Sequence, residues 1–341
     1  MPGVHIDRIN QVALILKDAE QPLKKRFRAL FTLRNYGGTT SIEAINEVVQ
    51  HDPSALLKHE CCYCLGQMAD PLAICHLTRV LADQRENEVV RHEAGEALGN
   101  LATDQDPELI KLLRNNLNDS SPIVAQTCEL ALDLIQWKAD THGDEQRGLA
   151  RLNPYSSQDP APSFRLDDPP VDQLNKILLD SQSTLFDKYR ALFTLRNRGD
   201  EQSIRVLGEA LVFYLDQDLM SLFKHEIGYI FGQMQSPQSI PYLKKALDCV
   251  REHEIVRHEA AEALGSVATL ESLEILKPFL NDEAVLVRNS VEVALDMIDY
   301  ENDADQFDFL SWVLDICVKI RLLNVYVYTL VSAQLLFLFA F

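Results

Sequence analysis

Histidine and glutamate stand next to each other at four places in a chain that contains only nine histidines. The four pairs are His59-Glu60, His92-Glu93, His225-Glu226 and His258-Glu259. Imidazole nitrogens and carboxylate oxygens, without thiolates, are ligands that suit iron(II), manganese or zinc. Two histidines and one carboxylate around a metal with open positions are typical of non-haem iron that activates O₂. The residue types therefore predict metal chemistry, with redox chemistry as one form of it.

The spacing of these pairs strengthens the prediction. The first and second pairs are 33 residues apart, as are the third and fourth, and the first two return 166 residues later. A single His-Glu pair on a helix is usually an exposed surface pair. The neighbouring repeats have other residues at these positions, namely Phe27-Arg28, Gln126-Thr127, Tyr189-Arg190 and Asn289-Ser290. We therefore expect two metal sites, one in each half, that face each other if the halves close around a pseudo-twofold axis.

The elements that must position these pairs are helices. FRALFTLRNYG at 27–37 returns as YRALFTLRNRG at 189–199, and within each half the units repeat about every 33 residues. Apolar residues inside each unit fall at helical spacing, with turn signals such as Asp70-Pro71 between them. Repeats of this length indicate stacked helical pairs. The predicted fold is all-α: an α-solenoid of HEAT-type helical pairs, in two symmetric four-repeat halves joined by a linker.

Four segments follow from this pattern: an N-terminal half at 1–138, a linker at 139–170, a C-terminal half at 171–303 and an atypical hydrophobic tail at 304–341. The linker is rich in proline, so we expect it to be extended and mobile. The tail ends in 20 uncharged residues after Arg321, enough for a membrane span. It could be a translated intron or alternative exon, a tail anchor, or an extra capping helix. No membrane contact is expected unless the tail is genuine.

A glycine follows each histidine of the four pairs after seven residues: Gly66, Gly99, Gly232 and Gly265. Glycine inside a helix costs about 0.5–1 kcal/mol relative to alanine. Either close helix packing or room for a substrate over the metal sites would compensate for this cost. The pattern excludes a zinc-protease HExxH motif, because the residue four positions after each histidine is tyrosine or glutamate.

Cysteine usage and charge limit the other possibilities. The chain has seven cysteines, an odd number, and no signal peptide, which favours unpaired thiols in a reducing cytoplasm. A zinc site on Cys61, Cys62 and Cys64 lacks a second Cys/His pair at finger spacing. The formal net charge of −19 argues against nucleic acid as a partner and favours a basic protein, although solubility alone could explain it.

Over about residues 1–303 the chain resembles the deoxyhypusine hydroxylase family, through KHE…LGQM and RHEA.EALG in both halves. The resemblance implies a di-iron monooxygenase with two Fe²⁺ per chain, O₂ as co-substrate, and translation initiation factor five A as the basic protein substrate whose deoxyhypusine becomes hypusine. It implies one iron on His59, His92 and Glu93, and the other on His225, His258 and Glu259. It further implies that Glu60 and Glu226 contact the cationic substrate arm and that Gly66 and Gly232 line its channel. The hydrophobic tail departs from this family.

Two other functions remain open on sequence alone. One is a non-catalytic HEAT scaffold that binds a basic protein, which would not need the His-Glu register. The other is a protein similar to bilin lyases, which also use short helical repeats but need a tetrapyrrole pocket.

Overall fold

The computed structural model describes residues 2–141, 148–149, 151–165, 169–215 and 217–302, and these residues form helices and no strands. The predicted hydrophobic tail at 304–341 lies outside the described residues. Among the described helices, none is long and apolar enough to cross a membrane.

The helices are arranged in consecutive pairs. The N-terminal half contains α1 (Pro2–Lys17), α2 (Leu23–Tyr36), α3 (Gly38–His51), α4 (Ala55–Gln67), α5 (Ile74–Ala82), α6 (Glu88–Leu101), α7 (Pro107–Asn115) and α8 (Pro122–Asp140). The C-terminal half contains α10 (Val171–Leu179), α11 (Leu185–Arg198), α12 (Glu201–Tyr214), α13 (Ser221–Met234), α14 (Ile240–Asp248), α15 (Glu254–Val267), α16 (Leu270–Leu276) and α17 (Val285–Asn302). The predicted all-α solenoid of helical pairs is confirmed for the described residues.

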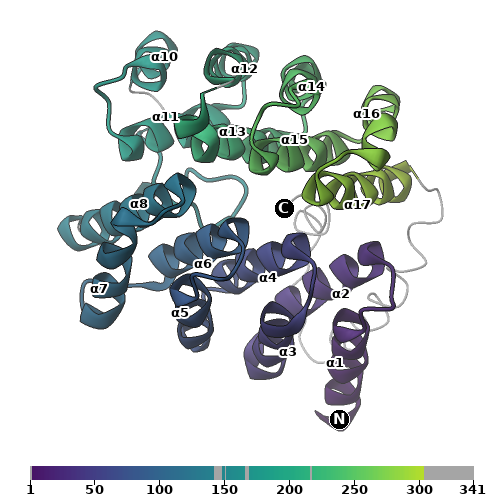
Figure 1. The fold of residues 1–341 in the computed structure, drawn as a ribbon. Coiled ribbons are helices and arrows are strands. Elements are labelled where there is room, and N and C mark those ends of the chain that lie inside the picture. The colour runs from purple at the N-terminus through teal and green to yellow at the C-terminus, as the bar shows by residue number, and fades with distance from the viewer. Residues whose placement is uncertain (1, 142–147, 150, 166–168, 216, 303–341) are drawn as a thin grey trace, which may run out of the picture.

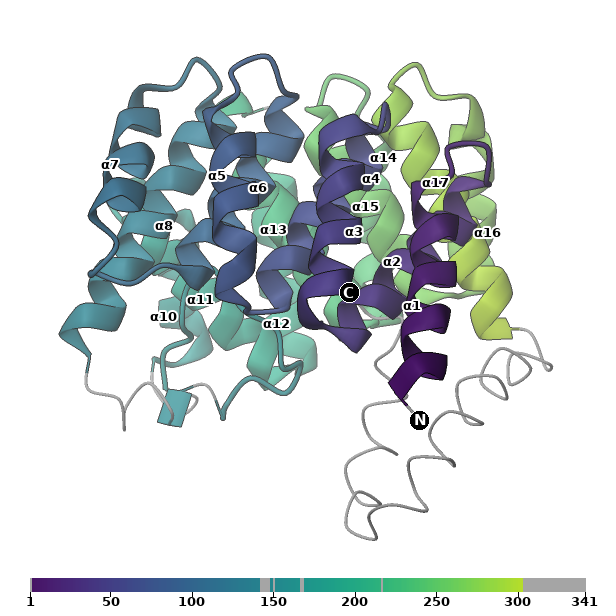
Figure 2. The same ribbon diagram turned by 90° about the horizontal axis from the view of Figure 1, so that it is seen from below.

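The two halves face each other as two rows of helices (Figure 1). The second helix of each pair lies on the inner side, and α2, α4, α6 and α8 pack in sequence, as do α11, α13, α15 and α17. The rows join at both ends, because α8 packs against α11 and α13 while α17 packs against α2 and α4. Seen from below, the helices of the N-terminal half stand in front of those of the C-terminal half (Figure 2). The chain thus closes on itself, with the two rows of inner helices facing each other.

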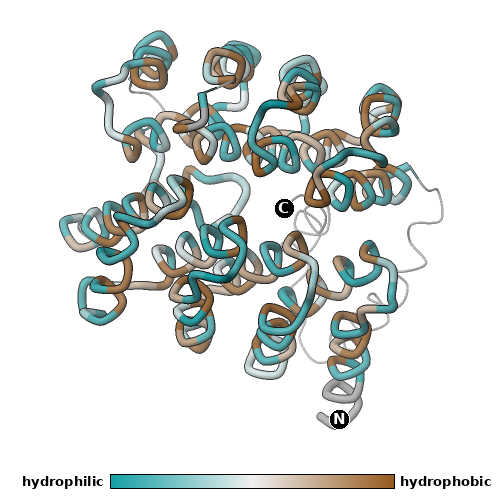
Figure 3. The backbone as a smooth tube through the Cα atoms, in the orientation of Figure 1, coloured by the Kyte–Doolittle hydropathy of each residue, from teal (hydrophilic) through white to brown (hydrophobic). Residues whose placement is uncertain are grey.

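Local sequence explains where the inner helices begin and what they bury. In α6 the side chain of Asn87 accepts a hydrogen bond from the backbone N–H of Val89 at 2.8 Å, which satisfies one of the free donors at the helix start. Ser54 caps α4 in the same way. The apolar faces of the paired helices turn toward each other, as the hydropathy colouring shows (Figure 3), and the buried apolar residues form one core across both halves.

The residue before each histidine fixes the rotation of its helix. These four cations form ion pairs whose side chains are largely or completely buried: Lys58 with Glu86, Arg91 with Asp119 (2.6 Å), Lys224 with Glu252 (2.5 Å) and Arg257 with Asp282 (2.5 Å). Because successive residues on a helix diverge by about 100°, anchoring the cation turns the following histidine and glutamate toward the centre.

The linker differs from our expectation of a mobile segment. In its described part, the Asp159 carboxylate accepts hydrogen bonds from Arg196 at 2.6 and 2.9 Å. The backbone of Gln158 bonds to the side chains of Gln67 (2.8 Å) and Asn100 (3.1 Å). Prolines keep this stretch extended, and side chains at the ends of the inner helices supply the hydrogen bonds that it cannot make internally. Sequence composition did not reveal these partners.

Candidate metal centre

The four histidines of the His-Glu pairs meet at the centre of the molecule. The ring centroids of His59 and His92 lie 5.5 Å apart, and those of His225 and His258 lie 5.4 Å apart. Across the two halves, the ring centroid of His59 lies 6.0 Å from that of His225 and 5.3 Å from that of His258. The side chains come from α4, α6, α13 and α15, and all four are almost completely buried. Because the two rows of helices join at both ends, histidines from both halves meet at one site. This is the arrangement expected if the halves are related by a pseudo-twofold axis.

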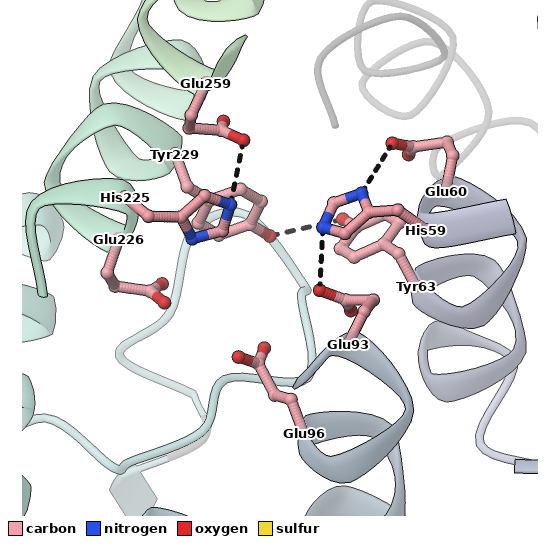
Figure 4. A pocket seen from close by; sticks show the side chains of 9 residues that line it. All are labelled: His59, Glu60, Tyr63, Glu93, Glu96, His225, Glu226, Tyr229 and Glu259. Carbon is pink, nitrogen blue, oxygen red and sulfur yellow. Dashed lines mark hydrogen bonds and ion pairs between the residues drawn. The ribbon is translucent and has the colours of Figure 1, made fainter. Parts of the chain in front are cut away.

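A carboxylate lies between the two histidines of each half. In the N-terminal half, Glu93 Oε2 lies 3.3 Å from His59 Nε2 and 3.6 Å from His92 Nε2. In the C-terminal half, Glu259 Oε2 lies 3.2 Å from His225 Nε2 and 4.0 Å from His258 Nε2. Figure 4 shows Glu93 and Glu259 reaching His59 and His225 from the neighbouring helices. In each half one carboxylate oxygen thus lies within 4.0 Å of both imidazoles.

The two halves are not identical in detail. Among the described residues, the potential ligand atoms of His59, His92 and Glu93 lie within 4.8 Å of one another, and these are the three residues that the family resemblance assigns to the first metal. In the C-terminal half the corresponding group is His258 with Glu259 and Glu262. Glu262 was not among the predicted ligands, although its position four residues after His258 places it on the same helix face. His225 also groups with His59 and His258, across the interface between the halves.

Two of the histidines are oriented by neighbouring helices. His92 Nδ1 lies 3.4 Å from Thr127 Oγ1 on α8, and His258 Nδ1 lies 3.4 Å from Ser290 Oγ on α17. Glu262 accepts a hydrogen bond from Ser290 at 2.7 Å and lies 3.5 Å from the same His258 nitrogen. Partners on Nδ1 hold the ring and leave Nε2 for a metal, which is how metal-binding histidines are usually fixed.

A small pocket adjoins the histidines. It is lined by His59, Glu60, Tyr63, Glu93, Glu96, His225, Glu226, Tyr229 and Glu259. Figure 4 shows Glu60, Glu226 and Glu96 around the same space. The hydroxyls of Tyr63 and Tyr229 lie 3.2 Å apart, one from each half. Burial raises the pKa of both tyrosines, so both hydroxyls stay protonated at neutral pH.

The residues present fit a bound metal. Several buried atoms at the site have no hydrogen-bond partner among the described residues: both ring nitrogens of His59 and His225, Nε2 of His92 and His258, and one carboxylate oxygen each of Glu60, Glu226 and Glu259. Each such group costs about 1–3 kcal/mol if nothing binds it. Burial, followed by the neighbouring imidazoles, lowers the pKa of His92 and His258, which keeps these rings neutral and able to bind a cation.

The carboxylates support the same conclusion. Burial and repulsion between neighbouring carboxylates raise the pKa of Glu60, Glu226 and Glu259 well above the ordinary value. Cations placed among these groups would offset both effects, since an opposite charge favours the ionised form. The site is therefore built for positive charge, either metal ions or a cationic substrate.

The glycines have a packing explanation. A Cβ atom at Gly66 would lie 2.8 Å from the Ala97 Cβ, and one at Gly265 would lie 2.7 Å from the Ala294 Cβ. These glycines thus allow neighbouring inner helices to approach closely. Neither Gly66 nor Gly232 lines the cavity, so a channel-lining role for these two remains a prediction that the cavity does not support.

Two residues of the site were not predicted from the sequence, whereas the state of the cysteines was. Glu96 and Glu262 belong to the site, and their signal was the position four residues after a histidine. Cys61, Cys62 and Cys64 are completely buried and unpaired, as expected. No group of potential ligands in the described part of the chain contains a cysteine.

Fold and site together define a HEAT-repeat protein whose two halves build one buried His/Glu site suited to metal ions. Known sequences agree on the fold: a family of HEAT repeats matches residues 10–99 and 221–296, and the PBS lyase HEAT-like repeat matches residues 90–119.

Similar proteins specify the family. Deoxyhypusine hydroxylase of Homo sapiens is 44% identical over 296 residues, covering 87% of this chain and 92% of the relative. The Drosophila melanogaster and Gallus gallus proteins of the same name are 43% and 46% identical, over 87% and 89% of this chain and 94% and 96% of their own lengths. The solved structure of human deoxyhypusine hydroxylase in complex with glycerol matches with a TM-score of 0.79 and 42% identity, over 88% of this chain and 98% of that one. This chain belongs to the deoxyhypusine hydroxylase family and is an oxidoreductase, a monooxygenase.

Proposed function

We propose that this protein hydroxylates the deoxyhypusine side chain of translation initiation factor five A to form hypusine, with two Fe²⁺ per chain and O₂ as co-substrate. The observation that carries the proposal is the meeting of four buried histidines and two bridging carboxylates from both halves around one cavity. Family membership supports the reaction, because the relatives bear the name of this activity.

In this proposal His59, His92 and Glu93 hold one iron, while the second iron is bound by His225, His258 and Glu259. Two imidazoles and one carboxylate leave coordination positions open, which suits iron that reacts with O₂. The bound irons would supply the O₂ activation that no side chain of the protein can provide. One oxygen atom enters the C–H bond and the other leaves as water, so two electrons must come from a reductant outside the chain.

The protein's own residues bind and orient the substrate. Glu60 and Glu226 line the cavity on opposite halves, and each has a buried oxygen without a hydrogen-bond partner among the described residues. We propose that these carboxylates bind the amino groups of the long deoxyhypusine side chain, which restores the charge balance that burial disturbs. Because the cavity lies beside the histidines, a bound side chain would extend past the metal sites. The walls of Tyr63 and Tyr229 then limit the water around it.

The remaining predictions concern the partner and its location. A net charge of −19 suits a basic protein surface around the modified side chain. Since that partner is a translation factor, we propose that the protein acts in the cytoplasm. Neither the scaffold nor the bilin-lyase alternative explains the buried register of four His-Glu pairs; the match to the lyase repeat covers residues 90–119.

Iron content per chain tests the proposal most directly. After anaerobic loading with iron(II), the full chain should bind two irons and hydroxylate the deoxyhypusine form of the factor. His59→Ala should lose iron and activity, and so should its pseudo-symmetric counterpart His225→Ala. His51→Ala is the matched control, because His51 is exposed at the end of α3 and lies outside the register. Full iron content in His59→Ala would show that the ligand assignment is wrong.

A further inference from the structure

The two halves differ at a pair of equivalent inner helices. Helix α2 carries FRALFTLRNY and helix α11 carries YRALFTLRNR at matching positions. Phe31, Thr32 and Arg34 of α2 therefore correspond to residues 193, 194 and 196 of α11. We call Phe31, Thr32 and Arg34 the α2 face. Equivalent sequences on equivalent helices should have equivalent surroundings, unless another part of the chain breaks the symmetry.

The linker breaks the symmetry between α2 and α11, because its residues 157–164 lie against α11. Arg196 donates to the Asp159 carboxylate and Thr194 Oγ1 accepts from the backbone N–H of Phe164 at 2.8 Å. The carbonyl of Pro162 accepts from Arg190 at 3.3 Å, and this guanidinium also lies over the Phe164 ring at 4.0 Å. An extended polypeptide thus occupies this face through backbone groups, one carboxylate and one ring.

Among the described residues, none covers the α2 face in this way. Phe193, Thr194 and Arg196 are 0% exposed, whereas Phe31, Thr32 and Arg34 are all only partly buried. Among the described residues, the Thr32 hydroxyl bonds only to the carbonyl of Arg28 in its own helix. Arg34 forms no ion pair with any residue that the structure describes; its guanidinium lies 5.8 Å from the Tyr63 ring. Five N–H donors of a half-buried guanidinium are thereby left for an external acceptor.

The position of this face matters because it lies next to the cavity, whereas polar contacts join the inner helices to one another at both of their ends. Residues 157–160 connect the ends of four inner helices, through Gln67 of α4, Asn100 of α6, and Arg196 and Gln233 of α11 and α13. At the opposite end of the inner helices, His253 Nε2 lies 3.2 Å from Glu88 Oε1 and bridges the two halves. The α2 face lies next to Tyr63, which lines the cavity.

We propose that the α2 face is where the protein substrate docks: an extended loop that carries the modified side chain lies along α2 as residues 157–164 lie along α11. Arg34 binds an acceptor oxygen of that loop, a carboxylate or a backbone carbonyl, and Thr32 accepts a backbone N–H. The modified side chain then enters beside Tyr63 and reaches Glu60 on the same helix, α4. This inference rests on the proposed function, because it names the docking surface for that substrate.

Steady-state kinetics of the full iron-loaded chain with the deoxyhypusine-bearing factor test the proposal. Arg34→Ala should raise KM by at least about tenfold, because a partly desolvated charged hydrogen bond is lost, with iron content and melting temperature kept. The KM of Arg34→Lys should fall between the values of Arg34→Ala and the unchanged chain, since lysine keeps the charge but not the paired N–H donors of the guanidinium. Arg205→Ala is the matched control: Arg205 is exposed on α12, and its ion-pair partner in the described part of the chain is Glu209 on its own helix. An unchanged KM in Arg34→Ala overturns the proposal.

Photo-crosslinking provides a readout that does not depend on turnover. A benzophenone amino acid at Phe31 should crosslink to the substrate protein, and the same group at Phe213, exposed on α12, should not. A crosslink from position 31 to residues 303–341 of this chain, unchanged by added substrate, would overturn the proposal in favour of an internal occupant. Absence of any crosslink would overturn it as well.

Failure of this inference and failure of the proposed function can be separated. If the unchanged chain binds no iron or does not hydroxylate the factor, the proposed function fails. If the unchanged chain is active and both position-34 variants behave like it, only the docking surface is wrong.

Discussion

Asp159→Ala should destabilise the protein through the linker without touching the metal site. Arg196 has no exposed surface, and its guanidinium donates to both carboxylate oxygens of Asp159 at 2.6 and 2.9 Å and to Gln233 Oε1 at 2.8 Å. Removing the carboxylate leaves a buried cation with only neutral partners. The destabilisation therefore comes from the uncompensated charge more than from the lost contact.

Breaking a buried ion pair from one side typically costs 3–5 kcal/mol. The Asp159 side chain keeps 11% of its surface exposed, so water can replace part of the lost carboxylate. We therefore expect a loss of about 2–4 kcal/mol in the free energy of unfolding. Asp159→Asn should lose less, because the amide oxygen still accepts one hydrogen bond from Arg196.

Chemical denaturation followed by circular dichroism measures this loss in the iron-loaded chain. Glu209→Ala is the matched control: it removes an ion pair of similar type, Arg205 to Glu209 at 3.1 Å, that is about half exposed. Exposed pairs contribute about 0–1 kcal/mol. A loss below about 1 kcal/mol in Asp159→Ala, or a loss equal to that of the control, would refute the view that the linker is fixed by this pair.

Three further predictions address the inner helices and the site. Gly66→Ala should cost about 1–2 kcal/mol in unfolding free energy, because overpacking against Ala97 exceeds the gain in helix propensity; Ala97→Gly in the same chain should recover part of it, and full stability of the single variant would contradict the packing explanation. Above about pH 7, where the histidines of the unfolded chain are already neutral, the metal-free protein should lose stability as pH rises, because the raised pKa of Glu60 and Glu226 means that the folded state holds more protons than the unfolded state; below that pH the lowered pKa of His92 and His258 acts in the opposite direction, so denaturation midpoints that rise from about pH 7 to 9 would refute this. Iodoacetamide followed by mass spectrometry should label the exposed Cys75 of the folded chain but not Cys61, whose burial raises the thiol pKa, and equal labelling of both would refute the burial.

Much of the site could be predicted because its signal is periodic. Each helical pair is encoded locally by apolar spacing and caps, and stacked repeats present equivalent positions in the same direction. The spacing of 33 and 166 residues therefore indicated that His59, His92, His225 and His258 would converge. No tertiary information was needed to select these residues, and the family resemblance supplied the roles that the spacing left open.

The sequence could not separate glutamates by role. Glu96 and Glu262 occur at equivalent positions, yet Glu262 bonds to Ser290 and groups with His258, whereas Glu96 lines the cavity. This difference depends on which residue of a neighbouring helix lies opposite. The difference arises from packing between helices, and no periodic pattern in the sequence encodes it.

By itself, the sequence determined the helical repeat, the pairing of the halves and the set of histidines, because all of these recur at fixed intervals. Only the tertiary structure decided that residues 157–164 cover α11 while the equivalent face of α2 stays partly exposed. The physical reason is that a non-repeating segment finds its hydrogen-bond partners across distant helices, such as Gln67 for Gln158. Those partners exist only once the two halves have closed into one molecule.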